Sequence, residues 1–167
     1  MDSEPRSFGL SANRLCAMTG VRYQTRDRWA KRGLLRKAPP YGELDLIEQL
    51  VLKALLATIP KSHVDLVWYQ VRGDLRGIAG NNRAALVWDS ELRQAKVSRS
   101  DAALSNLVRH GRPVYVLPLG EIVSQARAAY RAEARAAKRA AQARAHTANP
   151  DRAESPHRQA SRSSTVL

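Results

Sequence analysis

Cationic and hydrogen-bonding side chains are concentrated between residues 22 and 37 of the 167-residue chain. Arginine can bind guanine edges and phosphates, and glutamine can bind adenine edges, so such a set could read duplex DNA. The side chains that we expect to contact DNA are Arg22, Tyr23, Gln24, Thr25, Arg26, Arg28, Lys31, Arg32, Arg36 and Lys37.

The elements that must position these side chains are predicted to be two short helices joined by a tight turn. The first helix is expected to begin at Ser11, whose hydroxyl can accept hydrogen bonds from the free amides of the first turn. It is expected to end at Gly20, because a helix end favours a residue that tolerates positive φ. Two helices arranged in this way can insert the second one into a DNA major groove. An ordinary helical hairpin with a solvated basic face is the alternative interpretation.

The second helix is predicted to run from Tyr23 to Lys31 and to stop at Gly33. Trp29 is expected to be the residue that anchors this helix inward. An outer face is then predicted for Arg22, Gln24, Thr25, Arg26 and Arg28.

Residues across both helices follow a pattern of helix, Thr-Gly-Val turn, helix with a central aromatic residue, and Gly-Leu-Leu. They are Thr19, Gly20, Val21, Thr25, Arg26, Trp29, Gly33, Leu34 and Leu35. On these residues the segment 10–76 resembles the MerR-type winged-helix family, whose opening is also similar to that of excisionases. The resemblance implies a basic wing, here shortened to residues 36–42, and dimerisation through a C-terminal helix.

The composition points in the same direction. The chain has 28 Lys and Arg against 15 Asp and Glu, a net charge of +13. That surplus is large enough to attract a polyanion before any specific contact forms. The positive charge is spread along the chain, however, and such an Arg- and Ala-rich composition could also reflect a GC-rich genome, so the motif carries the functional argument.

Several function classes are disfavoured. A single cysteine, Cys16, allows no internal disulfide or multi-cysteine metal site within one chain and favours a cytoplasmic location. We expect Cys16 to pack as a small apolar residue. The chain has no apolar run of about 18 residues, so no membrane span is expected. With no phosphate-binding glycine loop and no paired-histidine zinc motif, we expect neither an enzyme nor a bound cofactor or metal.

Two further helices are predicted to complete the first domain. Apolar residues recur at helical spacing from Glu43 to about Ile59, and again from Ser62 to Leu75. Ser62 is expected to cap the fourth helix, with Asp65 in a capping-box position. Glycines and asparagines over 73–82 then predict a loop and a domain boundary.

Residues 83–118 are predicted to form a small βαβ-like α/β unit. Strands are expected at 84–88, 96–97 and 113–118, with a helix over 101–109 that Ser100 caps. The unit carries no recognisable motif. Packing and self-association is the favoured interpretation, and a partner-binding module or a small-molecule sensor remains open.

A long Arg- and Ala-rich helix is predicted over 119–145, because both residue types favour helices. Dimer contact, an arm lying on DNA phosphates and a solvated helix all remain open for it. Its basic residues include Arg127, Arg131, Arg135, Lys138 and Arg139. Residues 1–9 are expected to be flexible and residues 146–167 disordered.

The sequence therefore predicts a mainly α protein with an N-terminal winged helix-turn-helix, a small α/β middle unit and a long basic C-terminal helix. The expected function is sequence-specific binding of double-stranded DNA by a homodimeric transcriptional regulator. One alternative is an excisionase-like recombination or architectural factor. Another, from a different class, is a protein-interaction adaptor without specific DNA readout.

Overall fold

The computed structural model describes residues 8–78, 81–108 and 114–147. The chain divides into two compact units, Met1–Ala132 and Glu133–Leu167. Most of the predicted flexible N-terminus, the end of the predicted 101–109 helix and nearly all of the predicted disordered tail lie outside the described residues.

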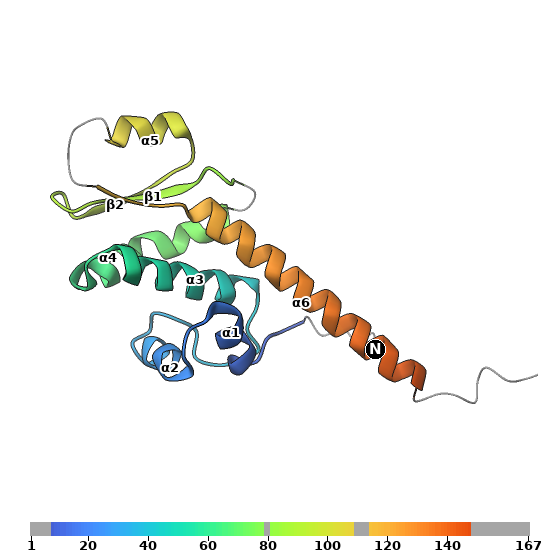
Figure 1. Cartoon of the computed structure of the whole chain (residues 1–167). Helices are drawn as coiled ribbons and strands as arrows, with labels where there is room; N and C mark the ends of the chain where they lie inside the picture. Colours follow the sequence, from blue (N-terminus) through green and yellow to red (C-terminus); the bar gives the residue numbers. More distant parts are fainter. Residues whose placement is uncertain (1–7, 79–80, 109–113, 148–167) are drawn as a thin grey trace, which may run out of the picture. The chain divides into compact units, whose positions relative to one another are not determined.

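The described chain is mainly helical and contains one three-stranded antiparallel sheet (Figure 1). A short 3₁₀ helix, η1, covers Gly73–Ile78. The α-helices and strands are α1 (Ala12–Thr19), α2 (Tyr23–Lys31), α3 (Glu43–Thr58), α4 (Lys61–Arg72), β1 (Ala85–Asp89), β2 (Gln94–Ser98), α5 (Asp101–Val108), β3 (Val114–Leu117) and α6 (Leu119–Thr147).

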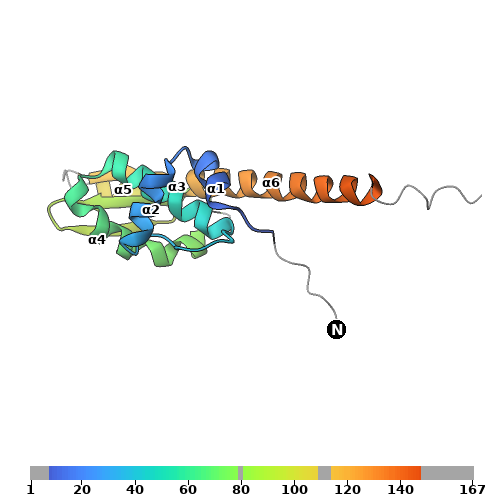
Figure 2. The same ribbon diagram turned by 90° about the horizontal axis from the view of Figure 1, so that it is seen from below.

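The first unit is layered. Figure 1 shows α5 on one face of the sheet and the pair α3 and α4 on the other. The helices α1 and α2 lie on the side of α3 that faces away from the sheet, and Figure 2 views the unit from that side. This arrangement leaves α2 at the outside of the helical layer.

The bounds predicted for the first two helices are confirmed. The Ser11 hydroxyl accepts a hydrogen bond from the Arg14 amide (3.2 Å), so Ser11 caps α1. Gly20 ends α1 in the left-handed conformation, with φ 65°. The next helix covers Tyr23–Lys31 as predicted, and Gly33 follows with φ 77°.

The capping prediction for the fourth helix is wrong. The helix α4 begins at Lys61, with Pro60 at the N-cap, so Ser62 already lies inside the helix. The Asp65 carboxylate instead accepts a hydrogen bond from the Arg32 guanidinium. The opposite charge on Arg32 gives this carboxylate a stronger partner than the amides of its own helix.

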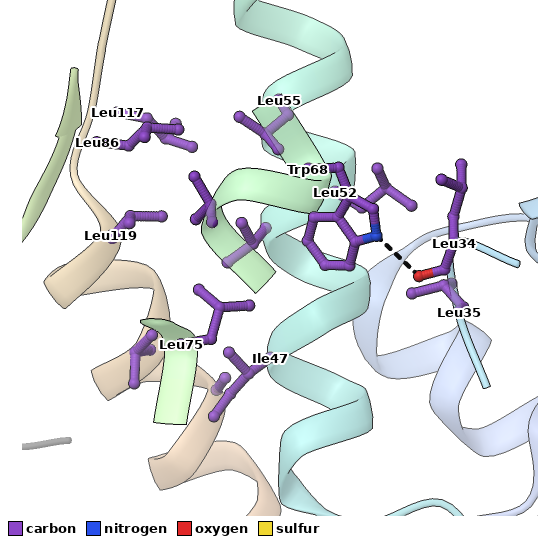
Figure 3. Packing of buried hydrophobic residues seen from close by; sticks show 14 of the residues in the cluster. Leu34, Leu35, Ile47, Leu52, Leu55, Trp68, Leu75, Leu86, Leu117 and Leu119 are labelled. Atoms are coloured by element: carbon purple, nitrogen blue, oxygen red, sulfur yellow. Dashed lines mark hydrogen bonds between the residues drawn. The ribbon is translucent and has the colours of Figure 1, made fainter. Parts of the chain in front are cut away.

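Buried hydrophobic residues taken from Leu10 through Ala126 in the sequence form one cluster in space, which is the hydrophobic core. Trp68 of α4 is fully buried at its centre and donates its indole N–H to the Leu34 carbonyl oxygen (2.9 Å; Figure 3). Leu86 and Leu117 of the sheet belong to the same core. Described residues on both sides of the predicted domain boundary at 73–82 therefore pack together in one unit.

The predicted βαβ-like unit is present in a split form, because α5 connects β2 to β3, and these two strands run parallel to each other on either side of β1. The strand order is β2-β1-β3, and both neighbours of β1 pair with it antiparallel. The first two strands are joined by residues 90–93, and a connection this short permits only an antiparallel hairpin. The Ser100 cap is confirmed, since its hydroxyl accepts a hydrogen bond from the Ala103 amide (3.2 Å).

The predicted shortened wing does not fold as a strand pair. Pro39 and Pro40 lack the amide hydrogens that a hairpin ladder needs. Tyr41 instead forms a two-hydrogen-bond bridge with Leu10, the residue before the α1 cap (2.8 and 3.0 Å). The segment 36–42 is thus a loop held against the start of α1.

The two units divide α6 between them. In the first unit, Leu119, Val123 and Ala126 are buried in the core. The Arg127 Nε donates to a Glu43 carboxylate oxygen (2.7 Å), and the Tyr130 hydroxyl donates to the Phe8 carbonyl (2.6 Å). The start of this helix, for which dimer contact was one of the open roles, therefore packs on its own chain.

The described part of the second unit is the helical segment 133–147, whose basic side chains are exposed. These are Arg135, Lys138, Arg139 and Arg144. None of the described helices is both long and apolar enough to cross a membrane.

Candidate nucleic-acid interface

The outer face of α2 presents basic, amide and aromatic side chains to solvent. Arg22, Tyr23, Gln24 and Arg28 are all exposed, and Tyr23 has an exposed fraction of 54%. The opposite face is apolar, with Trp29 buried as predicted. The helix therefore has the amphipathic character of an element that is anchored on one side and available for contact on the other.

Three of these four residues lie at the N-terminal end of α2, and Arg28 lies one turn further along the helix. Gln24 and Arg28 are four residues apart and so share one face of α2. Arg22 occupies the N-cap position without a side-chain hydrogen bond to the helix. Neither Arg22 nor Arg28 has an ion-pair partner among the described residues. Their guanidinium groups are consequently available for an anion or a base edge.

Arg26 does not lie on the outer face, so that prediction is wrong. Its exposed fraction is 4%, and its guanidinium lies over the Tyr41 ring, 4.2 Å from the centroid. One guanidinium nitrogen donates to the Arg36 carbonyl oxygen (2.6 Å). The helical period places Arg26 on the same side as Trp29, three residues later, and the loop 36–41 returns to cover it. Arg26 thus positions the loop and does not reach solvent.

Two further predicted contact residues are engaged in ion pairs. The Lys31 amine lies 2.7 Å from an Asp27 carboxylate oxygen, and this hydrogen bond raises the pKa of Lys31 above its ordinary value. Arg32 pairs with Asp65 of α4, and both side chains are about half exposed, at 51% and 48%. Exposed pairs of this kind contribute little to stability, so a phosphate could replace the carboxylate partner. Thr25 is half-buried.

The loop after α2 adds two exposed cations. The Arg36 guanidinium lies 3.8 Å from an Asp45 carboxylate oxygen, while the Lys37 side chain has no partner among the described residues. The Tyr41 hydroxyl donates to the Lys37 carbonyl oxygen (2.7 Å), which fixes the backbone of the loop. The structure therefore holds Lys37 on a fixed backbone with a free amine.

A buried polar network that the sequence interpretation did not identify holds the turn between α1 and α2. The Gln49 side chain of α3 is fully buried and donates to the Thr19 hydroxyl (2.6 Å). Lys53, one turn further along α3, donates to the Thr19 carbonyl oxygen (2.8 Å). The Thr19 hydroxyl itself donates to the Leu15 carbonyl (3.0 Å). A glutamine within the apolar stripe of the third helix was the available signal, because a buried amide requires partners.

Cys16 is buried in α1, as predicted for a packing residue. Burial raises the pKa of its thiol, although the nearby Arg26 charge and a hydrogen bond with Gln49 act in the opposite direction. A protonated, buried thiol is a poor nucleophile and a poor metal ligand. Within residues 8–78, 81–108 and 114–147, no three His, Cys, Asp or Glu side chains form a group that could hold a metal ion.

The structure thus leaves Arg22, Tyr23, Gln24 and Arg28 exposed at the N-terminal part of α2, with Gln24 and Arg28 on one face, and it buries Arg26. Scans against protein-family models and curated proteins give no match. The resemblance of residues 10–76 to the MerR-type family accordingly remains a prediction from the motif residues.

Proposed function

We propose that this protein is a sequence-specific DNA-binding protein that regulates transcription by placing α2 in the major groove. The single observation that carries the proposal is the exposed set Arg22, Tyr23, Gln24 and Arg28 on a helix whose other face is buried. Recognition helices contact base edges mainly through their N-terminal residues, which is where three of these four lie.

In the proposed complex, Gln24 and Arg28 read base edges from adjacent turns of α2. A glutamine amide is suited to adenine, and an arginine fork is suited to guanine. Arg22 lies at the helix N-terminus, where the free backbone amides also favour a phosphate. Lys37 and Arg36 contact the phosphates of the neighbouring backbone and fix the register of the helix.

The proposal includes a homodimer. Its two recognition helices would read two half-sites about one helical turn apart. The start of α6 packs within its own unit through Val123 and Ala126, so the dimer contact must use other residues. An excisionase-like architectural factor would use the same docking of α2. It would differ by bending its DNA site, which a comparison of electrophoretic mobility for permuted sites would detect.

A protein-interaction adaptor is the competing function from another class. The observation that favours it is a pair of exposed apolar side chains on α4, Leu66 (43% exposed) and Tyr69 (63%). In that case the positive charge is compositional, and binding to DNA is weak, salt-sensitive and independent of sequence.

The experiment that separates these functions is selection from a random duplex library at about 150 mM salt with the full chain. The DNA-binding proposal predicts an enriched motif that Arg28→Ala changes or abolishes. Arg76→Ala is the matched control, because it removes the same charge from an exposed site in η1. Absence of enrichment, with binding that disappears as salt rises, would reject the proposal and favour the adaptor.

A further inference from the structure

The two edges of the sheet differ in how they are protected. The strand order β2-β1-β3 places β2 at one edge and β3 at the other, while helices cover both faces (Figure 1). At the β2 edge, the Ala95 amide donates to the side-chain oxygen of Gln70 in α4 (2.9 Å). The same strand carries Lys96. A side-chain cap and a lysine both prevent an edge strand from pairing with another chain, so the β2 edge is blocked.

The β3 edge has neither form of protection. The strand contains only Val114, Tyr115, Val116 and Leu117, so it carries no charge. Tyr115 is 37% exposed and Val116 is 41% exposed. Among the residues that the structure describes, none pairs with the side of β3 that faces away from β1. An exposed apolar edge with unpaired peptide groups is a template for the addition of another strand.

The strand register shows which peptide groups are free at this edge. The Ala95 amide points away from β1, so Ala95 and Trp88 form a non-hydrogen-bonded pair. Because successive residues of a strand alternate, the peptide groups of Trp88 point to β3 and form a hydrogen-bonded pair with Tyr115. The amide and carbonyl groups of Val114 and Val116 therefore point away from the sheet.

We propose that β3 pairs antiparallel with β3 of a second copy of this chain, across a two-fold axis at Tyr115. Val114 of each copy then faces Val116 of the other, and each such pair exchanges two hydrogen bonds. The two Tyr115 side chains face each other, and aromatic pairs across strands are favourable. Because the strand is uncharged, no like charges meet there although the chain carries a net charge of +13.

A second copy fits this edge because the register is self-complementary. Both copies contribute the same residues, as a two-fold symmetric interface requires. The contact would supply the dimer of the proposed function, for which the start of α6 is already used within its own chain. A strand of this length buries less than the roughly 800 Å² per partner of a standard interface, so we expect a dissociation constant on the order of 10 μM.

Sedimentation velocity of the full chain without DNA, from about 1 to 200 μM, tests this inference. A reversible equilibrium between monomer and dimer is expected. Val116→Pro should raise the dissociation constant at least about tenfold, because proline removes an outward amide and leaves the ladder with β1 intact. Val97→Pro is the matched control, since it removes an outward amide from the β2 edge. It should leave the dissociation constant unchanged.

A second pair of variants does not alter the backbone. Val116→Lys places a charge on the free edge and should abolish the dimer. Leu92→Lys is its control, because Leu92 is 51% exposed in the turn between β1 and β2. Thermal unfolding of each variant verifies that the fold is retained.

Cross-linking tests the register. The two Tyr115 Cα atoms should lie about 4.5 Å apart in a non-hydrogen-bonded pair, within reach of a disulfide. Mild oxidation should therefore give a covalent dimer of Tyr115→Cys/Cys16→Ala, whereas Leu92→Cys/Cys16→Ala should remain monomeric under denaturing conditions.

Three results would overturn the inference. These are a monomer at every concentration, equal effects of the two lysine variants, or no cross-link through position 115. A monomer would leave the β3 edge to an extended segment of another protein. Because the test contains no DNA, a monomer that still selects a DNA motif rejects only this inference. A dimer that selects no motif rejects only the DNA-binding proposal.

Discussion

The guanidinium of Arg26 lies over the ring of Tyr41, with 4.2 Å between Cζ and the ring centroid. The same guanidinium donates to the Arg36 carbonyl, and the Tyr41 backbone bridges Leu10. One buried cation therefore connects α2, the following loop and the start of α1. The exposed arginine of this helix turn is Arg28, and the two arginines have different roles although they are two residues apart.

This difference predicts that replacing Arg26 lowers the stability of the fold and that replacing Arg28 does not. Arg26→Ala should lower the free energy of unfolding by about 1–3 kcal/mol, because it removes a charged hydrogen bond and a cation–π contact. Arg28→Ala should leave unfolding within about 0.5 kcal/mol of the parent, since its side chain is exposed. Urea denaturation followed by tryptophan fluorescence measures both. Equal stability of the two variants would contradict the assigned role of Arg26.

DNA binding should distinguish base contacts from phosphate contacts. For a selected site, Arg28→Ala should weaken binding by about 1–3 kcal/mol and relax the preference at one base pair. Lys37→Ala should weaken binding to all sequences alike and reduce the slope of log K against log salt by about 1. Fluorescence anisotropy titrations at several salt concentrations measure these effects. A sequence-independent loss for Arg28→Ala would reassign it to the phosphate backbone.

The helix ends of α1 and α2 could be predicted because they depend on local signals. Ser11 and Gly20 act on their immediate neighbours through capping and a positive φ, whatever the rest of the chain does. The burial of Arg26 depends instead on a loop ten or more residues away. Arg36 and Tyr41 of that loop contact Arg26 only after the chain has folded. A local pattern of charged residues therefore overestimated the exposed basic face.

The sheet illustrates the same limit. The short strands were recognisable from apolar runs, but strand order and direction depend on which edges meet after the chain turns. The Asp89 carboxylate accepts hydrogen bonds from two amides of the hairpin turn. Arg93 in that turn adopts φ 51°. The apolar residues of β1 and β2 do not indicate this turn geometry or the order of the strands. The exposed edge of β3 depends on that order, so it could not be predicted either.

Two glycines provide a direct test of the packing between α6 and the loop before β1. A Cβ at Gly120 would lie 2.3 Å from the Asn81 carbonyl oxygen and 2.6 Å from an Asn82 backbone carbon. Because backbone cannot rotate away, Gly120→Ala should destabilise the fold by about 1–3 kcal/mol. Gly73→Ala is the matched control, since Gly73 has a right-handed helical conformation and open space around it. It should be neutral or stabilising by up to about 1 kcal/mol. Thermal unfolding of both variants checks the prediction, and a neutral Gly120→Ala would contradict it.

Cys16 should make the fold sensitive to alkaline pH. Burial raises the pKa of its thiol in the folded state above the ordinary 9.0, so the unfolded chain releases this proton first. The stabilisation is complete below that ordinary value and is lost as pH rises through the folded-state pKa. Unfolding measured from pH 7 to 10.5 should therefore show a steeper loss for the parent than for Cys16→Ala. Identical pH dependence in the two proteins would rule out the thiol as the cause.

Glu48 and Arg72 join α3 to α4 through a two-point ion pair, with 2.9 Å from Nε to one carboxylate oxygen and 3.0 Å from Nη2 to the other. The Glu48 side chain is only 7% exposed, while that of Arg72 is 34% exposed. Arg72→Ala leaves the buried carboxylate without its cation, and we expect a loss of about 1.5–3 kcal/mol in unfolding free energy.

The exposed pair between Arg32 and Asp65 supplies the control, because water solvates either partner when the other is removed. Asp65→Asn should therefore lower stability by less than about 1 kcal/mol. The variant Glu48→Gln/Arg72→Ala should recover part of the loss of Arg72→Ala, since it no longer buries an unpaired charge. If the double variant is less stable than Arg72→Ala alone, the loss arises from side-chain packing of Arg72 against Trp68 and not from the ion pair.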